Sequence, residues 1–266
     1  MVSLDLVRAP LFVPANRPDR FAKAAASAAD AVILDLEDAV GPEEKEAARA
    51  EVQCDFTHKP VLVRINACGT PWHDADIAAV RALPVAGVIL PKAEDPTATV
   101  ALCRMLDGHA PVLALIETAL GLAQARSLAA LPGVKRLLFG SIDFCADMGC
   151  AHERDILLPV RSELVLASRL SGKPGPIDGV TARIDHRPEI LADAEHARAL
   201  GMSGKLCIHP RQVPEVLQGF APTADEVDWA QRVLGSGDGA VAVDGAMVDE
   251  PVRIRARHIL EAARPA

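Results

Sequence analysis

The sequence predicts an α/β fold, a (β/α)8 barrel of the TIM type with a C-terminal helical lid extension. Eight short apolar runs alternate with helix-length amphipathic segments over about 210 residues, which is the number and spacing of units in such a barrel. The chain has 266 residues, 50% of them hydrophobic, so it can bury a core of that size. An open doubly wound sheet is the alternative, although it rarely contains eight such evenly spaced units.

The first four strands are predicted at apolar runs that are bounded by turn residues. They cover residues 8–14, 31–36, 61–66 and 87–92. Pro18 falls in the favoured first turn of the helix after the first run, and Pro42 starts the helix after the second. Both prolines therefore support a change from strand to helix.

The last four strands are predicted by the same pattern. They cover residues 112–116, 137–142, 175–180 and 204–209, of which the third is the weakest. Helices are expected over residues 162–170 and from Pro188 to Gly201. The fifth run stops at Glu117 and the sixth at Asp143, so each of these strands is expected to end in a carboxylate.

Two domains are predicted, a catalytic barrel over residues 1–221 and a C-terminal segment over residues 222–266. Thr223 and Glu226 have the T-x-x-E spacing of a capping box at the start of a helix. A glycine-rich stretch at residues 235–239 predicts a flexible hinge, and a final helix is expected over residues 250–263. We expect this tethered segment to form a lid or to pack on a neighbouring subunit.

Composition and charge narrow the class of protein. The formal net charge of −8 argues against nucleic acid as a partner, because a basic stripe is the expected footprint. No apolar run reaches the roughly 20 residues that span a bilayer, and the N-terminus lacks a signal-peptide pattern, so we expect a cytoplasmic protein that does not enter the membrane. The six cysteines form no CxxC pair and are expected to be reduced thiols, mostly in the core.

Glu117 and Asp143 are the first candidates for a functional pair. If the runs before them are neighbouring parallel strands, both carboxylates lie at one edge of the sheet. Two hard oxygen ligands suit Mg²⁺, which completes its octahedral coordination with water or substrate oxygens. The alternative is that both acids cap the helices that follow, which requires no metal.

Other polar residues also stand where the predicted strands end. They are Glu37, Asp38, Arg64, Asn66, Lys92 and His209. Active sites of (β/α)8 barrels form at this C-terminal face, so the distribution favours an enzyme with a metal site there. Each residue also has an ordinary alternative, since cations at strand ends are often solvated and acids are favoured at helix N-termini.

Eight sequence blocks resemble the β-subunit of citrate lyase and its relatives in the HpcH/HpaI aldolase superfamily, over nearly the whole chain. The first four are LFVPANRPDR at residues 11–20, AVILDLEDAV at 31–40, VRIN at 63–66 and LPK at 90–92. The others are IET at residues 116–118, GSIDF at 140–144, GKLCIHP at 204–210 and DGAMVDEPV at 244–252.

The resemblance implies roles for particular residues. Glu117 and Asp143 match the two Mg²⁺ ligands, and Arg64 matches the arginine that binds the carboxylate of a 2-oxo acid or hydroxy acid. Asp249 matches the lid aspartate that, in the acyl-CoA lyases of the family, reaches into a neighbouring subunit's site as a general acid/base. The family therefore implies a homo-oligomer, a trimer or a hexamer.

Further residues are matched around that centre. They are two acids at the floor of the site, of which the first is expected to act in catalysis, and a lysine beside them: Glu37, Asp38 and Lys92. We expect Arg17 to bind CoA phosphates in a basic patch with Arg20 and Lys23, and an exposed helix face is the alternative.

The resemblance, together with these residues, implies a Mg²⁺-dependent lyase that cleaves a 3-hydroxyacyl-CoA to acetyl-CoA and a 2-oxo acid, with citramalyl-, malyl- and citryl-CoA as the candidates. The alternatives are a malyl-CoA-type thioesterase, a 2-oxo-acid aldolase that uses no CoA, and a citrate-lyase subunit or binding module that needs partner chains. Ala15 stands where the family usually has glycine, and Leu120 where an arginine is frequent. These departures fall on the CoA side rather than the metal side.

Overall fold

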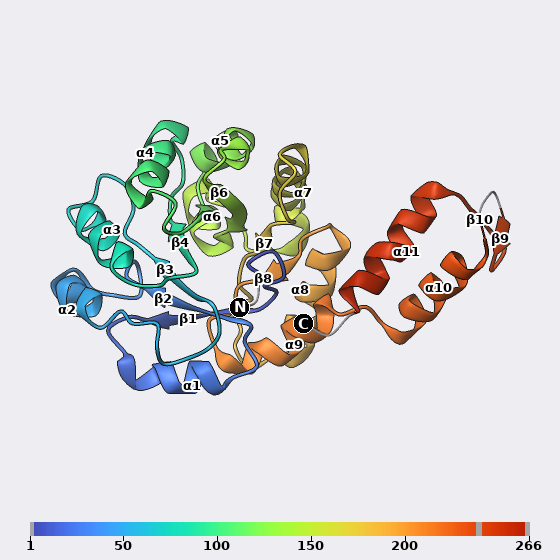
Figure 1. Cartoon of the computed structure of the whole chain (residues 1–266), viewed down its shortest axis with the longest axis horizontal. Coiled ribbons are helices and arrows are strands. Elements are labelled where there is room, and N and C mark those ends of the chain that lie inside the picture. The colour runs from blue at the N-terminus through green and yellow to red at the C-terminus, as the bar shows by residue number, and fades with distance from the viewer. Residues whose placement is uncertain (1–2, 238–240, 264–266) are drawn as a thin grey trace.

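The computed structural model describes residues 3–237 and 241–263, and eight parallel strands form one sheet in sequence order (Figure 1). The strands are β1 Pro10–Pro14, β2 Ala31–Asp35, β3 Val61–Arg64, β4 Gly87–Leu90, β5 Val112–Ile116, β6 Val134–Phe139, β7 Ile177–Asp178 and β8 Gly204–Lys205. All eight predicted strands are therefore present, although β7 and β8 are shorter than the apolar runs suggested.

The sheet closes on itself between β8 and β1. Leu11 pairs with Cys207 in a parallel bridge, and the Cys207 N–H donates to the Pro10 carbonyl at 2.9 Å. The Phe12 N–H donates in turn to the Cys207 carbonyl at 2.8 Å. The predicted (β/α)8 barrel is thus confirmed, and the open-sheet alternative is excluded.

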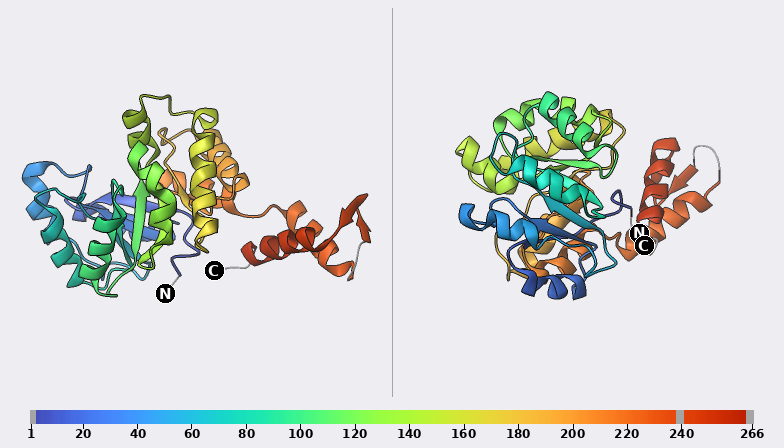
Figure 2. Two further views of the ribbon diagram at one scale, coloured as in Figure 1. Left: turned by 90° about the horizontal axis from the view of Figure 1, so that it is seen from above. Right: turned by 60° about the vertical axis from the view of Figure 1, so that its left-hand side comes forward.

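Helices surround the barrel (Figures 1 and 2). They are α1 Phe21–Ala26, α2 Lys45–Ala50, α3 His73–Arg81, α4 Pro96–Leu106, α5 Ala119–Ala130, α6 Ser141–Met148, α7 Arg154–Leu170, α8 Arg187–Ala199 and α9 Val213–Phe220. Successive strand residues face opposite sides of the sheet, so Val32 and Leu34 pack under the helices, whereas Ile33 lies in the barrel interior. This alternation divides the core into two apolar layers.

The predicted bounds are also wrong at the sixth strand and at the helix before β7. The sixth strand ends at Phe139 rather than Ile142, because Gly140 leaves the extended conformation and Ser141 begins α6. Asp143 therefore lies in the first turn of a helix and not at a strand end. Helix α7 begins at Arg154, eight residues before the predicted start at Ser162, and accommodates Pro159.

The C-terminal segment forms an arm with a small core of its own. It consists of α10 Ala224–Gly235, a hairpin of β9 Val241–Val243 and β10 Ala246–Val248, and α11 Glu250–Ala262. The predicted capping box is confirmed, since Thr223 Oγ1 accepts from the Glu226 N–H at 3.1 Å and Glu226 Oε2 accepts from the Thr223 N–H at 2.8 Å. The hairpin was not predicted.

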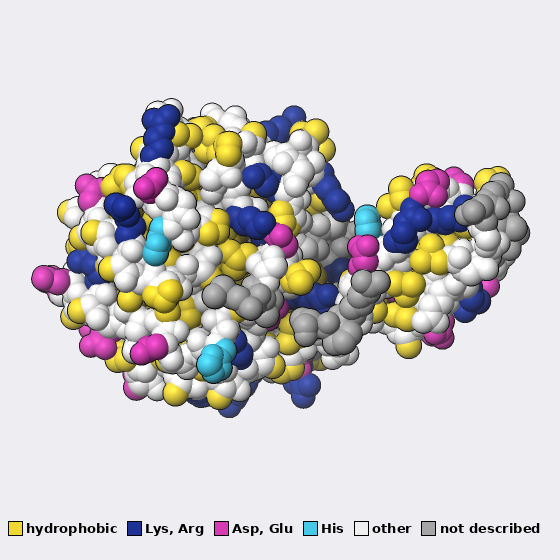
Figure 3. Space-filling model, in the orientation of Figure 1, with side chains coloured by type: hydrophobic (Ala, Val, Ile, Leu, Met, Phe, Trp, Pro, Cys, Tyr) yellow, Lys and Arg dark blue, Asp and Glu magenta, His cyan; other side chains and the backbone are white. Residues whose placement is uncertain are grey.

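The arm extends away from the barrel and joins it through a narrow connection (Figures 2 and 3). One contact across this connection is the hydrogen bond from Arg8 Nη2 to the Ala262 carbonyl, at 2.9 Å. Of the predicted hinge, Gly235 ends α10, while residues 238 and 239 lie outside the described residues. In the described part of the chain, no helix is long and apolar enough to cross a membrane.

Candidate active site

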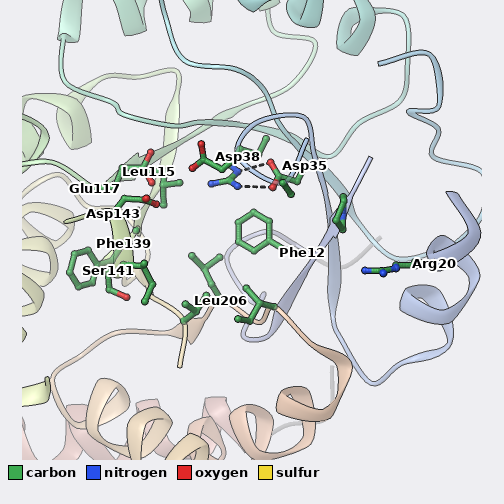
Figure 4. Close-up of a pocket in the computed structure, with 17 residues that line it drawn as sticks. Phe12, Arg20, Asp35, Asp38, Leu115, Glu117, Phe139, Ser141, Asp143 and Leu206 are labelled. Atoms are coloured by element: carbon green, nitrogen blue, oxygen red, sulfur yellow. Dashed lines mark hydrogen bonds and ion pairs between the residues drawn. The ribbon is translucent and has the colours of Figure 1, made fainter. Parts of the chain in front are cut away.

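A cavity of about 420 Å³ opens at the C-terminal end of the barrel (Figure 4). Its polar wall comes from the ends of β2, β3 and β5 and the start of α6: Asp35, Asp38, Arg64, Glu117 and Asp143. Its apolar wall is formed by Phe12, Leu115, Phe139, Val180, Leu206 and Ile208. The cavity thus has the charged and apolar sides typical of a small-molecule site.

Glu117 is fully buried directly after β5. Its Oε1 accepts the Lys92 N–H at 2.7 Å, whereas its Oε2 has no hydrogen-bond partner among the described residues. A β-carbon at residue 140 would overlap this carboxylate, so glycine is required there. Burial, reinforced by the Glu37 carboxylate, raises the pKa of Glu117 to about 8. The Glu117 side chain therefore has one buried oxygen that can accept a contact from a ligand in the cavity.

Asp143 supplies a second carboxylate at the cavity wall. It is half-buried in the first turn of α6, and no described residue forms a hydrogen bond or ion pair with it. Figure 4 shows Glu117 and Asp143 on the same side of the cavity. The structure therefore brings the predicted pair together even though Asp143 is helical.

Arg64 is held by two carboxylates. Its Nε and Nη2 donate to Asp35 Oδ1 and Oδ2 at 2.7 and 2.6 Å, and its Nη1 lies 3.0 Å from Glu37 Oε2. The guanidinium also stacks over the Phe12 ring, 4.9 Å from its centroid. A guanidinium carries five N–H donors, so these contacts leave two for a ligand in the cavity. Arg64 is thus fixed and can still bind a carboxylate.

Lys92 connects the acids of the site. Its Nζ donates to Glu37 Oε1 at 2.5 Å and lies 3.9 Å from Glu117 Oε1 and 4.0 Å from Asp38 Oδ2. Its φ of 46° is in the left-handed region, which non-glycine residues adopt at a cost of about 1–3 kcal/mol. In this conformation its N–H donates to Glu117 while its ammonium reaches Glu37. The strain therefore serves the geometry of the site.

The charge balance of the site is negative. The carboxylates of the cavity and of the ion pairs behind it are Asp35, Glu37, Asp38, Glu117 and Asp143. The cations are Arg20, Arg64 and Lys92, which leaves a formal charge of −2. No group of three or more His, Cys, Asp or Glu side chains within residues 3–237 and 241–263 could hold a metal ion. Two carboxylates, with water or ligand oxygens, nevertheless fit Mg²⁺, which rarely uses an all-protein cage.

Arg17 and Asp249 neither line the cavity nor contact its charged side chains. Arg17 is partly exposed and pairs with Asp19, with Nε and Nη2 each 2.8 Å from a carboxylate oxygen. Arg20, one turn further along the chain, lines the cavity instead. Asp249 is exposed in the arm, where it caps α11 by accepting the Val252 N–H at 3.3 Å. In this chain Asp249 is therefore not part of the cavity.

Asp35 is the residue that sequence reasoning missed. It ends an otherwise apolar strand, and β2 pairs with β3 so that Asp35 stands directly beside Arg64. An acid at the end of such a run, level with an arginine on the next strand, was the available signal. It makes Asp35 the group that orients Arg64.

Comparisons with known proteins show which proteins the chain is similar to. A family model described as HpcH/HpaI aldolase/citrate lyase matches residues 8–210. A citrate lyase subunit beta-like protein of Deinococcus radiodurans is 38% identical over 96% of both chains, and a (3S)-malyl-CoA thioesterase of Cereibacter sphaeroides is 32% identical over 96% of this chain and 94% of its own. The crystal structure of CitE of Mycobacterium tuberculosis with magnesium, acetoacetate and coenzyme A has a TM-score of 0.87 and 37% identity, covering 98% of this chain and 99% of that one.

Proposed function

Because this chain belongs to the HpcH/HpaI aldolase/citrate lyase family, we propose that it cleaves the carbon–carbon bond of a 3-hydroxyacyl-CoA to give acetyl-CoA and a 2-oxo acid. Its class is a Mg²⁺-dependent lyase. The observation that carries the proposal is the unpartnered Oε2 of buried Glu117, which faces the same cavity as Asp143 and the two free donors of Arg64.

Glu117 and Asp143 would hold the metal ion. Their cavity carries a surplus of two negative charges, and a divalent cation would relieve the burial of a carboxylate whose pKa is raised to about 8. When bound, Mg²⁺ would supply Lewis-acid stabilisation for the negative charge on the substrate's hydroxyl oxygen after that oxygen loses its proton, a charge that passes to the enolate as the carbon–carbon bond breaks.

Arg64 would bind the carboxylate of the 2-oxo acid half of the substrate. Asp35 fixes the guanidinium through two parallel hydrogen bonds, so its free donors are oriented before the substrate arrives. Glu37 and Lys92 support these groups, because Glu37 contacts Arg64 and the Lys92 N–H donates to Glu117, and the two side chains also pair with each other. Their proposed role is to orient Arg64 and Glu117.

The CoA arm would enter beside Arg20 and Lys23. A second cavity of about 350 Å³ shares Phe12, Pro14, Arg20 and Ile208 with the first, and Lys23 also lines it. Its apolar strand residues suit a pantetheine chain, and the two cations suit phosphate groups. The predicted role of Arg17 in this patch stays a prediction, since its guanidinium is paired with Asp19.

Asp249 would act as the general acid/base on the carbon of the acetyl-CoA enolate. Because it lies in the arm and outside its own chain's cavity, this role requires the arm of a neighbouring subunit. The proposal therefore includes a homo-oligomer, with a trimer or a hexamer as the expected states.

The test is an assay of the purified chain with Mg²⁺ against malyl-, citramalyl- and citryl-CoA, in which 2-oxo acid and free CoA are measured separately. A lyase releases 2-oxo acid and acetyl-CoA from at least one of them, without an equal amount of free CoA. Release of CoA without 2-oxo acid would instead establish a thioesterase, the alternative that the Cereibacter relative favours. Turnover of a 2-oxo acid and an aldehyde without CoA would indicate the aldolase, and activity only with added partner chains would indicate a citrate-lyase subunit.

A further inference from the structure

Cys68 and His73 form a thiol–imidazole pair outside the cavity described above. Cys68 lies in the loop between β3 and α3 and His73 is the first residue of α3, and Cys68 Sγ is 3.5 Å from His73 Nε2. All six cysteines are in the described part of the chain, and Cys68 is the exposed one. The His73 side chain, by contrast, is buried. An exposed nucleophile therefore stands against a fixed base.

The hydrogen-bond pattern defines which ring nitrogen faces the thiol as an acceptor. His73 Nδ1 lies 2.7 Å from the Asn66 carbonyl oxygen, which can only accept, so Nδ1 must carry the proton. In the neutral ring Nε2 then has a free lone pair directed at the Cys68 thiol. Cys68 is thus the nucleophile, His73 the base and the Asn66 carbonyl the group that orients the base, an arrangement that is typical of activated nucleophiles.

The orienting group is itself held rigidly. Asn66 Nδ2 donates to the Leu36 carbonyl at 3.0 Å and to Asp76 Oδ2 at 2.6 Å, and the Asn66 N–H donates to the same Asp76 oxygen at 2.9 Å. The Asn66 carbonyl is therefore fixed by two elements. The loop does not need to rearrange for His73 to accept a proton.

The charges around His73 also favour its protonated form. The hydrogen bond with Cys68, against the opposing effect of burial, raises the pKa of His73, and the Asn66 carbonyl and the Asp74 carboxylate add to the rise. The buried thiols have the opposite environment, since desolvation raises the pKa of Cys145 to about 11 and that of Cys207 further. Cys68 is thus the thiol with both access and a base.

We propose that Cys68 is a reactive modification site that takes low-molecular-weight disulfides by thiol–disulfide exchange. The proton of the Cys68 thiol passes to His73 Nε2, and the thiolate sulfur attacks one sulfur of the disulfide. The disulfide's S–S bond breaks as the Cys68 mixed disulfide forms, and the departing thiolate takes the proton from the imidazolium. The disulfide is the only oxidant, and the original thiol returns when a reducing thiol reverses the step.

The test exposes the whole protein to glutathione disulfide at neutral pH and follows the adducts by intact mass and peptide mapping. We expect one adduct per chain, on Cys68, which dithiothreitol removes. His73→Gln should slow this reaction at least about tenfold, because the general base is lost. Cys150→Ser, which removes a partly buried thiol outside the pair, should leave the rate unchanged.

Two results would overturn the proposal. One is modification of Cys150 as fast as Cys68 in the unaltered protein, a comparison that does not depend on any variant folding. The other is a His73→Gln protein, shown to be folded by circular dichroism, in which Cys68 reacts at the original rate.

Discussion

Replacing Asp35 by asparagine tests whether the Arg64 guanidinium is oriented by its strand neighbour. The change keeps the shape of the side chain and removes the charge that two hydrogen bonds of 2.7 and 2.6 Å share. Breaking a buried ion pair costs about 3–5 kcal/mol, because the remaining charge stays buried. Glu37 still lies 3.0 Å from Arg64 Nη1, so we expect the lower end, about 3 kcal/mol of the free energy of unfolding.

The assay is urea unfolding of the metal-free protein, followed by steady-state kinetics of the folded variant. Asp19→Asn is the matched control, because it removes the same charge from the solvent-screened pair with Arg17 and should leave the unfolding midpoint nearly unchanged. We expect kcat/KM of Asp35→Asn to fall about 100-fold, since the carboxylate of the substrate meets a misaligned donor pair. Equal unfolding midpoints for the two variants would refute the reasoning, as would lost activity with unchanged stability.

Three further predictions follow from the structure. Glu117→Gln should abolish Mg²⁺-dependent turnover and weaken Mg²⁺ binding measured by calorimetry, while leaving the metal-free protein folded; retained metal binding would count against the proposed ligand. Asp249→Asn should be inactive alone, and mixing it with an inactive Glu117→Gln protein under subunit exchange should restore partial activity, because some sites then combine an intact cavity with an intact arm; no recovery in a demonstrated mixed oligomer would contradict the crossing arm. Burial would raise the pKa of Asp178, but Lys205 and Arg161 outweigh it and hold that pKa below its usual value. The Asp178 carboxylate therefore contributes its full stabilisation above the ordinary pKa of about 3.8, and this stabilisation is lost as pH falls through the lower pKa of the folded protein. If the unaltered protein and Asp178→Asn lost stability in parallel in acid unfolding curves, Asp178 would not be the source of this pH dependence.

The order and number of the strands could be predicted because each strand is a short apolar run and each helix a longer amphipathic one. The family expected from the sequence blocks is confirmed by the match over residues 8–210. The end of β6 was predicted wrongly because Leu137–Ile142 is apolar throughout apart from Gly140 and Ser141, so hydrophobicity alone does not mark where the strand gives way to α6. The hairpin of the arm was missed since its strands have three residues each, too few to show a period.

The candidate site residues that stand at the ends of strands could be predicted from the sequence, whereas those placed by strand register or by a turn could not. Arg64 ends β3, and Glu37, Lys92 and Glu117 come just after β2, β4 and β5, so the barrel alone brings these residues to one face. Asp35 was not predicted as a site residue because it lies within an apolar run and was assigned to the strand. Its position beside Arg64 depends on the pairing register of β2 and β3, which the sequence does not give. Arg20 lines the cavity and Arg17 does not. The 3-10 turn Pro18–Arg20 lies between the two residues, and the sequence did not predict which of them would face the cavity.

Two buried charge clusters in this barrel show how a functional site differs from a structural one. Asp178 accepts hydrogen bonds from Arg161 at 2.8 Å and from Lys205 at 2.9 Å, so both of its carboxylate oxygens are used within the protein. Glu117 is equally buried, yet one of its oxygens has no partner among the described residues, and its pKa is raised rather than lowered. Leaving a buried acceptor unsatisfied costs about 1–3 kcal/mol, a loss that a bound cation would remove. A bound cation would therefore stabilise Glu117, whereas both carboxylate oxygens of Asp178 are already used by neighbouring side chains.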